Sequence, residues 1–178
     1  MEDWVAWHRL YDDPDSALRT RLAYVTAHLR GTLDQAPPGP IRLLSLCAGQ
    51  GRDVLEVLVR QADASVIANF ADALPVDVLL LAGIFGNVND ADIKRTVDAA
   101  PALCAPGATV IWTRHRRPPD VTGQIRDWFA ANGFDEVAFE ALQTESLIGV
   151  GVHRLARRSP EAAGYREQPL FTFGSQHC

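Results

Sequence analysis

The sequence lacks the features of proteins that bind nucleic acid, cross membranes or carry a signal peptide. Its 178 residues include 17 Lys and Arg against 22 Asp and Glu, a net charge of −5, whereas a nucleic-acid-binding surface normally brings a basic excess. No apolar run approaches the roughly 20 residues of a membrane-spanning helix. The N-terminal stretch MEDWVAWHRLYDDPD is acidic and aromatic, unlike a signal peptide. We therefore expect a small-molecule partner, no nucleic acid and no membrane.

Cysteine is also scarce. Cys47, Cys104 and Cys178 are odd in number and widely spaced, so they suggest neither a disulfide framework nor a metal-ligand cluster. Isolated thiols are typical of a reducing compartment, and we expect a cytoplasmic protein without a metal site. The chain also lacks a Walker A lysine, a GxSxG nucleophile elbow and an HExxH zinc motif, which excludes the sites that those motifs build.

What is present is an apolar chain of domain size. A hydrophobic content of 47% over 178 residues suits one domain with a single core. Trp4, Trp7 and Tyr11 fall at helical spacing, and Leu and Val recur at steps of three and four between positions 18 and 33. Two N-terminal helices are therefore predicted. Asp13 is the expected N-cap of the second helix and Pro14 its first residue.

Beyond a proline-rich linker at 36–40, strands and helices alternate. Strands are predicted at 41–47, 76–82, 108–113, 134–142 and 146–155, and helices from 52, at 66–74, at 93–103 and from 118. The alternation predicts an α/β protein with a doubly wound, Rossmann-like sheet, mostly parallel, with an antiparallel C-terminal strand pair. The expected organisation is an N-terminal helical cap at 1–40, a Rossmann-like domain at 41–155 and a tail at 156–178.

A glycine loop follows the first predicted strand, in the stretch LSLCAGQGRD at 44–53. Ligands of doubly wound sheets bind beyond the carboxyl ends of the strands, so this loop lies at the expected crevice. Its glycines allow close approach of a ligand or form an ordinary tight turn. The run GQGRDV starts like the dinucleotide fingerprint, but Val54 replaces the third glycine. Asp53 in the first helical turn would oppose a pyrophosphate there, which disfavours a dinucleotide.

The loop and three later segments together resemble the class I S-adenosylmethionine-dependent methyltransferases. Residues 45–51 are similar to the family's first motif, with Ser45 in place of its acidic residue and Cys47 in place of its first glycine. Residues 75–88 look like the family's fourth strand and the loop facing the methyl donor. Residues 103–115 look like the segment that enters its fifth strand, and 129–141 look like the run into its sixth strand. The resemblance covers about residues 41–155. The N-terminal segment is similar to an actinobacterial-type subgroup of small methyltransferases.

This resemblance implies S-adenosylmethionine as the cofactor and methyl transfer to a small-molecule nucleophile. The segment QADAS at 61–65 resembles the end of the third strand, where the family contacts adenine, although a surface acid is the alternative for Asp63. The residues that the resemblance assigns to cofactor binding are Cys47, Ala48, Gly49, Gln50, Gly51, Asp63, Ala64, Gly83, Ile84 and Phe85.

Candidates for the substrate side come from the N-terminal region and the segments after the later strands. Tyr11, Asn87 and Arg114 are the expected substrate-binding residues, although Asn87 can instead cap the next helix. His115 is the candidate general base, because the unperturbed pKa of histidine lies near neutrality; a solvated loop histidine is the alternative. The neighbouring arginines, Arg116 and Arg117 among them, either recruit an anionic substrate or form a solvated basic cluster.

One departure from the family concerns the stretch between the glycine loop and the strand at 76–82. The family places a second strand there, whose acidic end grips the ribose, and residues 52–75 leave no room for it. We therefore expect a segment to be missing, with the junction near Leu58 and Val59. If the chain truly lacks this unit, a non-catalytic Rossmann-like binding domain becomes the better hypothesis. A nicotinamide-dependent oxidoreductase is the third.

Overall fold

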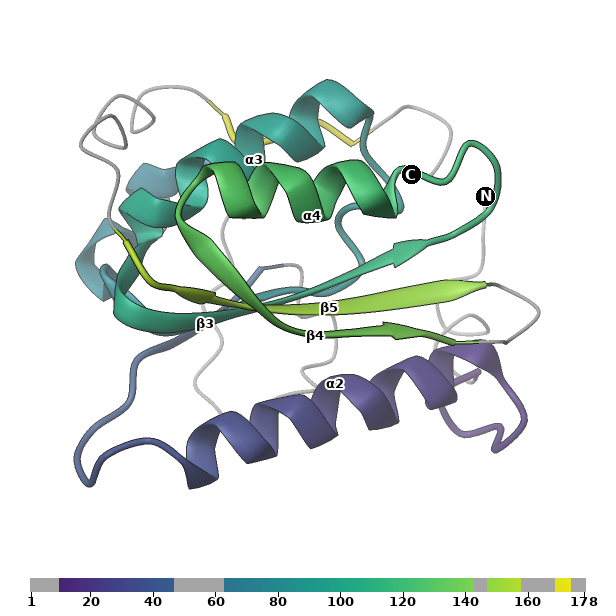
Figure 1. Cartoon of the computed structure of the whole chain (residues 1–178), viewed down its shortest axis with the longest axis horizontal. Coiled ribbons are helices and arrows are strands. Elements are labelled where there is room, and N and C mark those ends of the chain that lie inside the picture. The colour runs from purple at the N-terminus through teal and green to yellow at the C-terminus, as the bar shows by residue number, and fades with distance from the viewer. Residues whose placement is uncertain (1–9, 47–62, 143–146, 158–168, 174–178) are drawn as a thin grey trace.

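A five-stranded sheet forms the centre of the protein (Figure 1). The structure, a computed structural model, describes residues 10–46, 63–142, 147–157 and 169–173. The strand order is β1-β2-β3-β5-β4. The strands are β1 (Leu43–Ser45), β2 (Val76–Leu81), β3 (Cys104–His115), β4 (Phe134–Ala141) and β5 (Ile148–Leu155).

The strand directions confirm the predicted fold class. β1, β2 and β3 run parallel to one another. β5 lies between β3 and β4 and is antiparallel to both. The C-terminal strands are thus antiparallel neighbours, and the last strand enters the sheet instead of lying at its edge. This central position buries most of β5 on both faces, although its sequence alternates like a strand with one exposed face.

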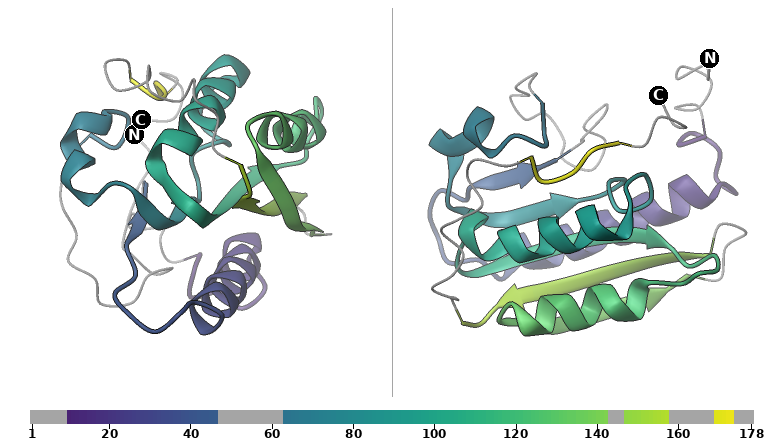
Figure 2. Two further views of the ribbon diagram at one scale, coloured as in Figure 1. Left: turned by 60° about the vertical axis from the view of Figure 1, so that its left-hand side comes forward. Right: turned by 90° about the horizontal axis from the view of Figure 1, so that it is seen from above.

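Helices cover both faces of the sheet. α2 (Ala17–Asp34) lies on one face, and α3 (Asp90–Leu103) and α4 (Thr122–Ala131) lie on the other. The views in Figure 2 also show α2 on the opposite side of the sheet from α3 and α4, so the fold has three layers. The predicted helix at 66–74 is a 3₁₀ segment, Ile67–Ala73, that is kinked at Phe70. None of the helices that the structure describes has the length and apolar character needed to span a bilayer.

β2 shows why the sheet lies between two helical layers. Val78 and Leu80 pack with Val25 and Leu29 of α2, whereas Leu79 and Leu81 belong to the cluster beneath α3 and α4. All four β2 side chains are buried, as expected for a strand covered on both sides.

The start of α2 differs from the prediction. The helix begins at Ala17, and its N-cap is Ser16, whose Oγ accepts a hydrogen bond from the backbone N–H of Arg19 at 3.0 Å. Asp13 instead forms a turn: its carboxylate accepts from the N–H of Asp15 at 3.0 Å, and its carbonyl accepts from the N–H of Ser16 at 3.2 Å. The Asp13 and Pro14 prediction was wrong because serine is an equally good cap and the aspartate is used within the turn.

β1 forms one edge of the described sheet. It pairs with β2 through Leu43, Leu44 and Ser45, and no described strand pairs with its other side. The second strand expected from the family resemblance would lie on that side. The predicted junction near Leu58 and Val59 falls in residues 47–62, outside the described residues, so the missing segment stays a prediction.

Candidate functional site

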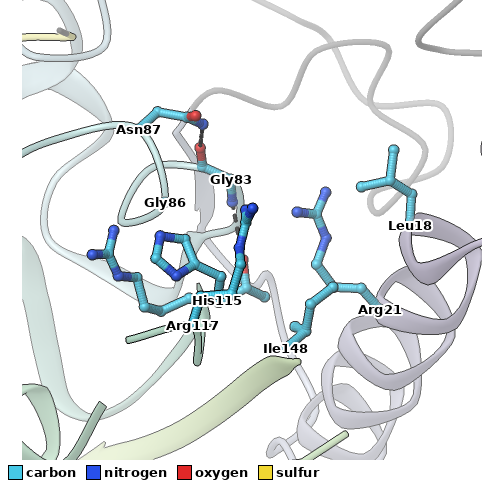
Figure 3. Close-up of a pocket in the computed structure, with 10 residues that line it drawn as sticks. Leu18, Arg21, Gly83, Gly86, Asn87, His115, Arg117 and Ile148 are labelled. Carbon is cyan, nitrogen blue, oxygen red and sulfur yellow. Dashed lines mark hydrogen bonds between the residues drawn. The ribbon is translucent and has the colours of Figure 1, made fainter. Parts of the chain in front are cut away.

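A pocket lies where the carboxyl ends of β2 and β3 meet the start of β5 and the first turns of α2 (Figure 3). These ends share one edge of the sheet because β2 and β3 are parallel and β5 is antiparallel to β3. The pocket has a volume of about 180 Å³. It is lined by Leu18, Arg21, Gly83, Gly86, Asn87, Thr113, Arg114, His115, Arg117 and Ile148.

The loop after β2 is held against β3 by hydrogen bonds. The backbone N–H of Gly83 donates to Thr113 Oγ1 at 3.0 Å, and Asn87 Nδ2 donates to the Gly83 carbonyl at 2.6 Å (Figure 3). Gly83 has a φ of +80°, which glycine adopts without strain. A Cβ added there would meet no heavy atom within 4 Å, so the loop borders open space.

Asn87 does not cap the following helix. The side chain of Asn89 does so, accepting from the N–H of Asp92 at 2.9 Å. Asn87 is an exposed residue of the pocket wall, and its amide is held by the Gly83 carbonyl. The structure therefore places this predicted substrate-binding residue at the pocket as a support of the β2 loop.

Arg114 is a deeply buried charged side chain of the pocket wall. Its side chain is 9% exposed, and it donates from Nη1 to the Phe85 carbonyl. Its Nη2 lies 3.8 Å from a carboxylate oxygen of Asp90. Burial lowers the pKa of Arg114 and Asp90 opposes this shift, but an arginine stays charged at neutral pH. Within the described residues, its Nε is buried with no hydrogen-bond partner.

Arg21 reaches the pocket from α2, far from the other lining residues in the sequence. Figure 3 shows its side chain extending from the helix toward the pocket. Its Nη2 donates to the Tyr11 hydroxyl at 2.8 Å, so the predicted substrate-binding residue Tyr11 contacts a lining residue without lining the pocket itself. The sequence reasoning missed Arg21. Its position in the sequence could have identified it: Arg21 lies four residues before Val25 and eight before Leu29, so it falls on the stripe of α2 that faces the sheet.

The arginines at the end of β3 and just after it do not all line the pocket. Arg114 and Arg117 line the pocket, whereas Arg116 does not and instead lies 3.5 Å from a carboxylate oxygen of Asp120. The structure thus brings two of the three neighbouring arginines to the site.

His115 lies in the pocket wall between these arginines. Burial lowers its pKa, and the positive charges of Arg114 and Arg117 lower it further, against an opposing effect of Asp120 and Asp90. Both effects favour the neutral imidazole, which is the form that a general base requires. Its Nδ1 is buried and has no hydrogen-bond partner among the described residues.

The predicted cofactor residues are distributed unevenly over the structure. Cys47, Ala48, Gly49, Gln50 and Gly51 lie outside the described residues, as do Trp4 and Trp7. Ile84 and Phe85 are fully buried in the core, so contact with a cofactor would require their backbone. Ala64 is half-buried and packs against the same core.

Asp63 is engaged within its own turn. Its carboxylate accepts from the backbone N–H of Ser65 at 2.9 Å and from the Ser65 hydroxyl at 2.7 Å. These hydrogen bonds lower the pKa of Asp63, the hydroxyl having the larger effect. A ligand contact at Asp63 would compete with both bonds.

Comparison with known proteins identifies the fold. No protein-family model and no curated protein matches the sequence. Among solved structures, the chain is similar to the CurJ carbon methyltransferase, with a TM-score of 0.60 and 18% identity over 87% of this chain and 59% of that one. It is also similar to a possible exported protein from Bordetella parapertussis, with a TM-score of 0.59 and 13% identity over 79% and 69% of the two chains. At these identities the similarity shows a shared Rossmann-like fold.

Proposed function

We propose that the protein transfers a methyl group from S-adenosylmethionine to a small-molecule nucleophile bound in the pocket. The observation that carries the proposal is geometric: His115 lies beside the open glycine loop after β2, with its Cδ2 3.9 Å from where a Cβ on Gly86 would be, at the carboxyl edge of a Rossmann-like sheet. Ligands of such sheets bind at this edge. The shared fold with a protein named as a carbon methyltransferase supports the choice of reaction.

Among the described residues, the loop after β2 is where S-adenosylmethionine fits. Gly83 fits it, because the open space beside the loop would be filled by any larger side chain. When bound, S-adenosylmethionine supplies a methyl group already activated by its sulfonium. No described strand beyond β1 offers a carboxylate for the ribose, and Asp63 is bound to Ser65. The remaining cofactor contacts are therefore assigned to the loop at 47–51, which lies outside the described residues.

The size of the pocket supports the proposal that it holds the acceptor. Its volume of about 180 Å³ is below the ~300–1,000 Å³ of pockets that hold drug-sized ligands. A whole nucleoside cofactor does not fit within it, whereas a small acceptor or one end of a larger acceptor does. Gly83 lies in the pocket wall, so an acceptor bound here is next to the loop that faces the cofactor.

His115 acts as the base when the acceptor arrives protonated. Its neutral imidazole accepts the proton that the acceptor's oxygen or nitrogen releases on methylation. The hydrogen bonds from Gly83 to Thr113 and from Asn87 to Gly83 hold the loop beside it. The chain's main contribution is positioning, since the acceptor atom must lie in line with the bond that breaks.

Isothermal titration with S-adenosylmethionine and S-adenosylhomocysteine tests this proposal. We expect both to bind the folded protein, and Gly83→Leu to weaken both. Gly107→Leu is the matched control, because Gly107 also has a φ of +80° with open space beside it but lies at the other end of β3. Absence of heat with either ligand, while circular dichroism shows a folded chain, would refute the proposal.

The alternative is a non-catalytic Rossmann-like binding domain, which the similarity to a carbon methyltransferase does not favour and for which one described feature can be cited. β1 is an edge strand within the described residues, so the strand that carries the family's ribose carboxylate has no described counterpart. The nicotinamide alternative rests on residues 49–54, and no described residue favours it. Quenching of tryptophan fluorescence by NADH and by S-adenosylhomocysteine, compared side by side, separates the three hypotheses.

A further inference from the structure

We propose that the methyl acceptor is a small oxyanion, carrying a carboxylate or a phosphate, and that Arg21, Arg114 and Arg117 bind its charged group. Only the role of the ligand as methyl acceptor rests on the proposed function. The anion site itself is argued from the pocket alone. Its arginines come from opposite sides, Arg21 from α2 and the other two from the end of β3 and the segment after it.

The charge of the pocket is opposite to that of the whole chain. The chain has a net charge of −5, yet three arginines and no acidic residue are among the described residues that line the pocket. Arg21 donates to a neutral hydroxyl, that of Tyr11. Neither Arg21 nor Arg117 has a carboxylate at ion-pair distance within the described part of the chain. The basic character of the pocket is therefore a local feature.

Acidic residues at the rim neutralise only part of this charge. Asp90 lies 3.8 Å from Arg114 Nη2, and its side chain is 53% exposed. A solvated carboxylate at that distance compensates the Arg114 charge only in part. Asp120 does not line the pocket and lies 3.5 Å from Arg116, although its charge also acts on Arg114 and His115. Three arginines against these two rim carboxylates leave positive charge for a ligand.

Arg114 gives independent evidence for a missing partner. Its side chain is 91% buried, since it is 9% exposed, and its Nε–H has no hydrogen-bond partner among the described residues. A buried charged donor without a partner is unfavourable, because its hydration has been lost without replacement. Arg114 lines the pocket, so an anion bound there would compensate this buried positive charge. The planar guanidinium matches a carboxylate or a phosphate, which can accept two parallel hydrogen bonds.

The rest of the pocket wall indicates that the ligand also has an apolar part. Leu18 and Ile148 add apolar surface next to the arginines. A volume of about 180 Å³ suits one charged group with a compact apolar part. His115 lies between Arg114 and Arg117 in the chain, so an anion held by these arginines is anchored close to the proposed base.

The test uses benzoate and phenyl phosphate as probes and benzamide as the uncharged control. Binding to the full chain is followed by the arginine Nε–H signals in ¹H–¹⁵N spectra. We expect both anions to bind and benzamide to bind at least tenfold more weakly. Arg21→Gln and Arg117→Gln should each weaken anion binding by about tenfold, the usual effect of losing a charge-assisted hydrogen bond. The ratio of the two anion affinities shows which oxyanion the site prefers.

Arg30→Gln is the matched control, because it removes the same charge from an exposed position of the same helix. Equal weakening by Arg30→Gln, or equal binding of benzoate, phenyl phosphate and benzamide, would overturn the inference. A further arm compares S-adenosylhomocysteine with methylthioadenosine, which lacks the amino-acid carboxylate. If Arg21→Gln weakens only S-adenosylhomocysteine, the arginines serve the cofactor's carboxylate and the inference is wrong.

The two proposals fail in different ways. Anion binding that depends on Arg21 and Arg117, without any binding of S-adenosylhomocysteine, would refute the proposed function and support the anion site. Binding of S-adenosylhomocysteine without selective anion binding would refute the anion site and leave the proposed function in place.

Discussion

Acidification should destabilise the protein through His153, a buried histidine in the middle of β5. Its side chain is 1% exposed and stacks on the ring of Phe129 at a centroid distance of 4.5 Å. It is also stacked with Trp112 at 6.1 Å. Neither ring nitrogen has a hydrogen-bond partner within the described residues. Protonation would therefore place a charge in an apolar stack with no acceptor for its protons.

The magnitude follows from the pKa of this group. Burial lowers the pKa of His153 from 6.5 to about 4, with Glu136 opposing the shift and Arg126 adding to it. Folding thus favours the neutral ring, so the stabilisation is fully present above the unfolded pKa and is lost as the pH falls through the window from 6.5 to about 4. Linkage converts this shift into about 3 kcal/mol of unfolding free energy lost between pH 7 and pH 4.

Urea unfolding at pH 7, 5.5 and 4 measures this loss, and His153→Phe isolates the contribution of the histidine. Phenylalanine keeps a flat ring in the stack and cannot take up a proton. We expect the difference in unfolding free energy between variant and wild type to shift by about 3 kcal/mol in favour of the variant on going from pH 7 to pH 4. His28→Phe, on the partly exposed side of α2, is the control for the same exchange elsewhere.

A parallel acid dependence in wild type and His153→Phe would refute this reasoning. Such a result would mean that the histidine is protonated in the folded protein without cost, or that its ring leaves the stack. If His28→Phe gains as much stability relative to wild type at low pH as His153→Phe does, the effect comes from replacing a histidine in general and not from His153.

Three further predictions concern the base, the packing and the helix cap. His115→Ala should lower single-turnover methylation by roughly 10²–10⁴-fold and leave S-adenosylhomocysteine affinity unchanged, as expected for a base; an unchanged rate with a protonated acceptor would make His115 a wall residue only. Gly151→Ala should destabilise the protein by about 1–3 kcal/mol in urea unfolding, because its Cβ would lie 2.2 Å from Cε2 of the fully buried Trp112; wild-type stability would contradict the packing of β5 on β3. Ser16→Ala should cost about 1 kcal/mol through loss of the N-cap, and a larger loss from Asp13→Ala would restore the cap first predicted.

The sequence by itself determined most of the secondary structure and the class of the fold. The apolar run at 76–82 predicted a strand buried on both faces, and β2 is such a strand. The leucine spacing predicted α2, and Gly133 with a φ of +83° ends α4 as expected of a C-cap glycine. These features are local: hydrophobic period and glycine conformation depend on residues within a few positions of each other.

Only the tertiary structure decided the order of the strands and the composition of the pocket. β5 lies between β3 and β4 because both of its faces and both of its edges find partners there, which its alternating sequence does not indicate. Arg21 lies more than 90 positions before Arg114 in the chain, and no spacing rule connects them. They share a pocket because α2 packs across β3 and β5, through contacts made by Val25 and Leu29. A local pattern can specify an element, whereas the meeting of two elements depends on the packing of the surfaces between them.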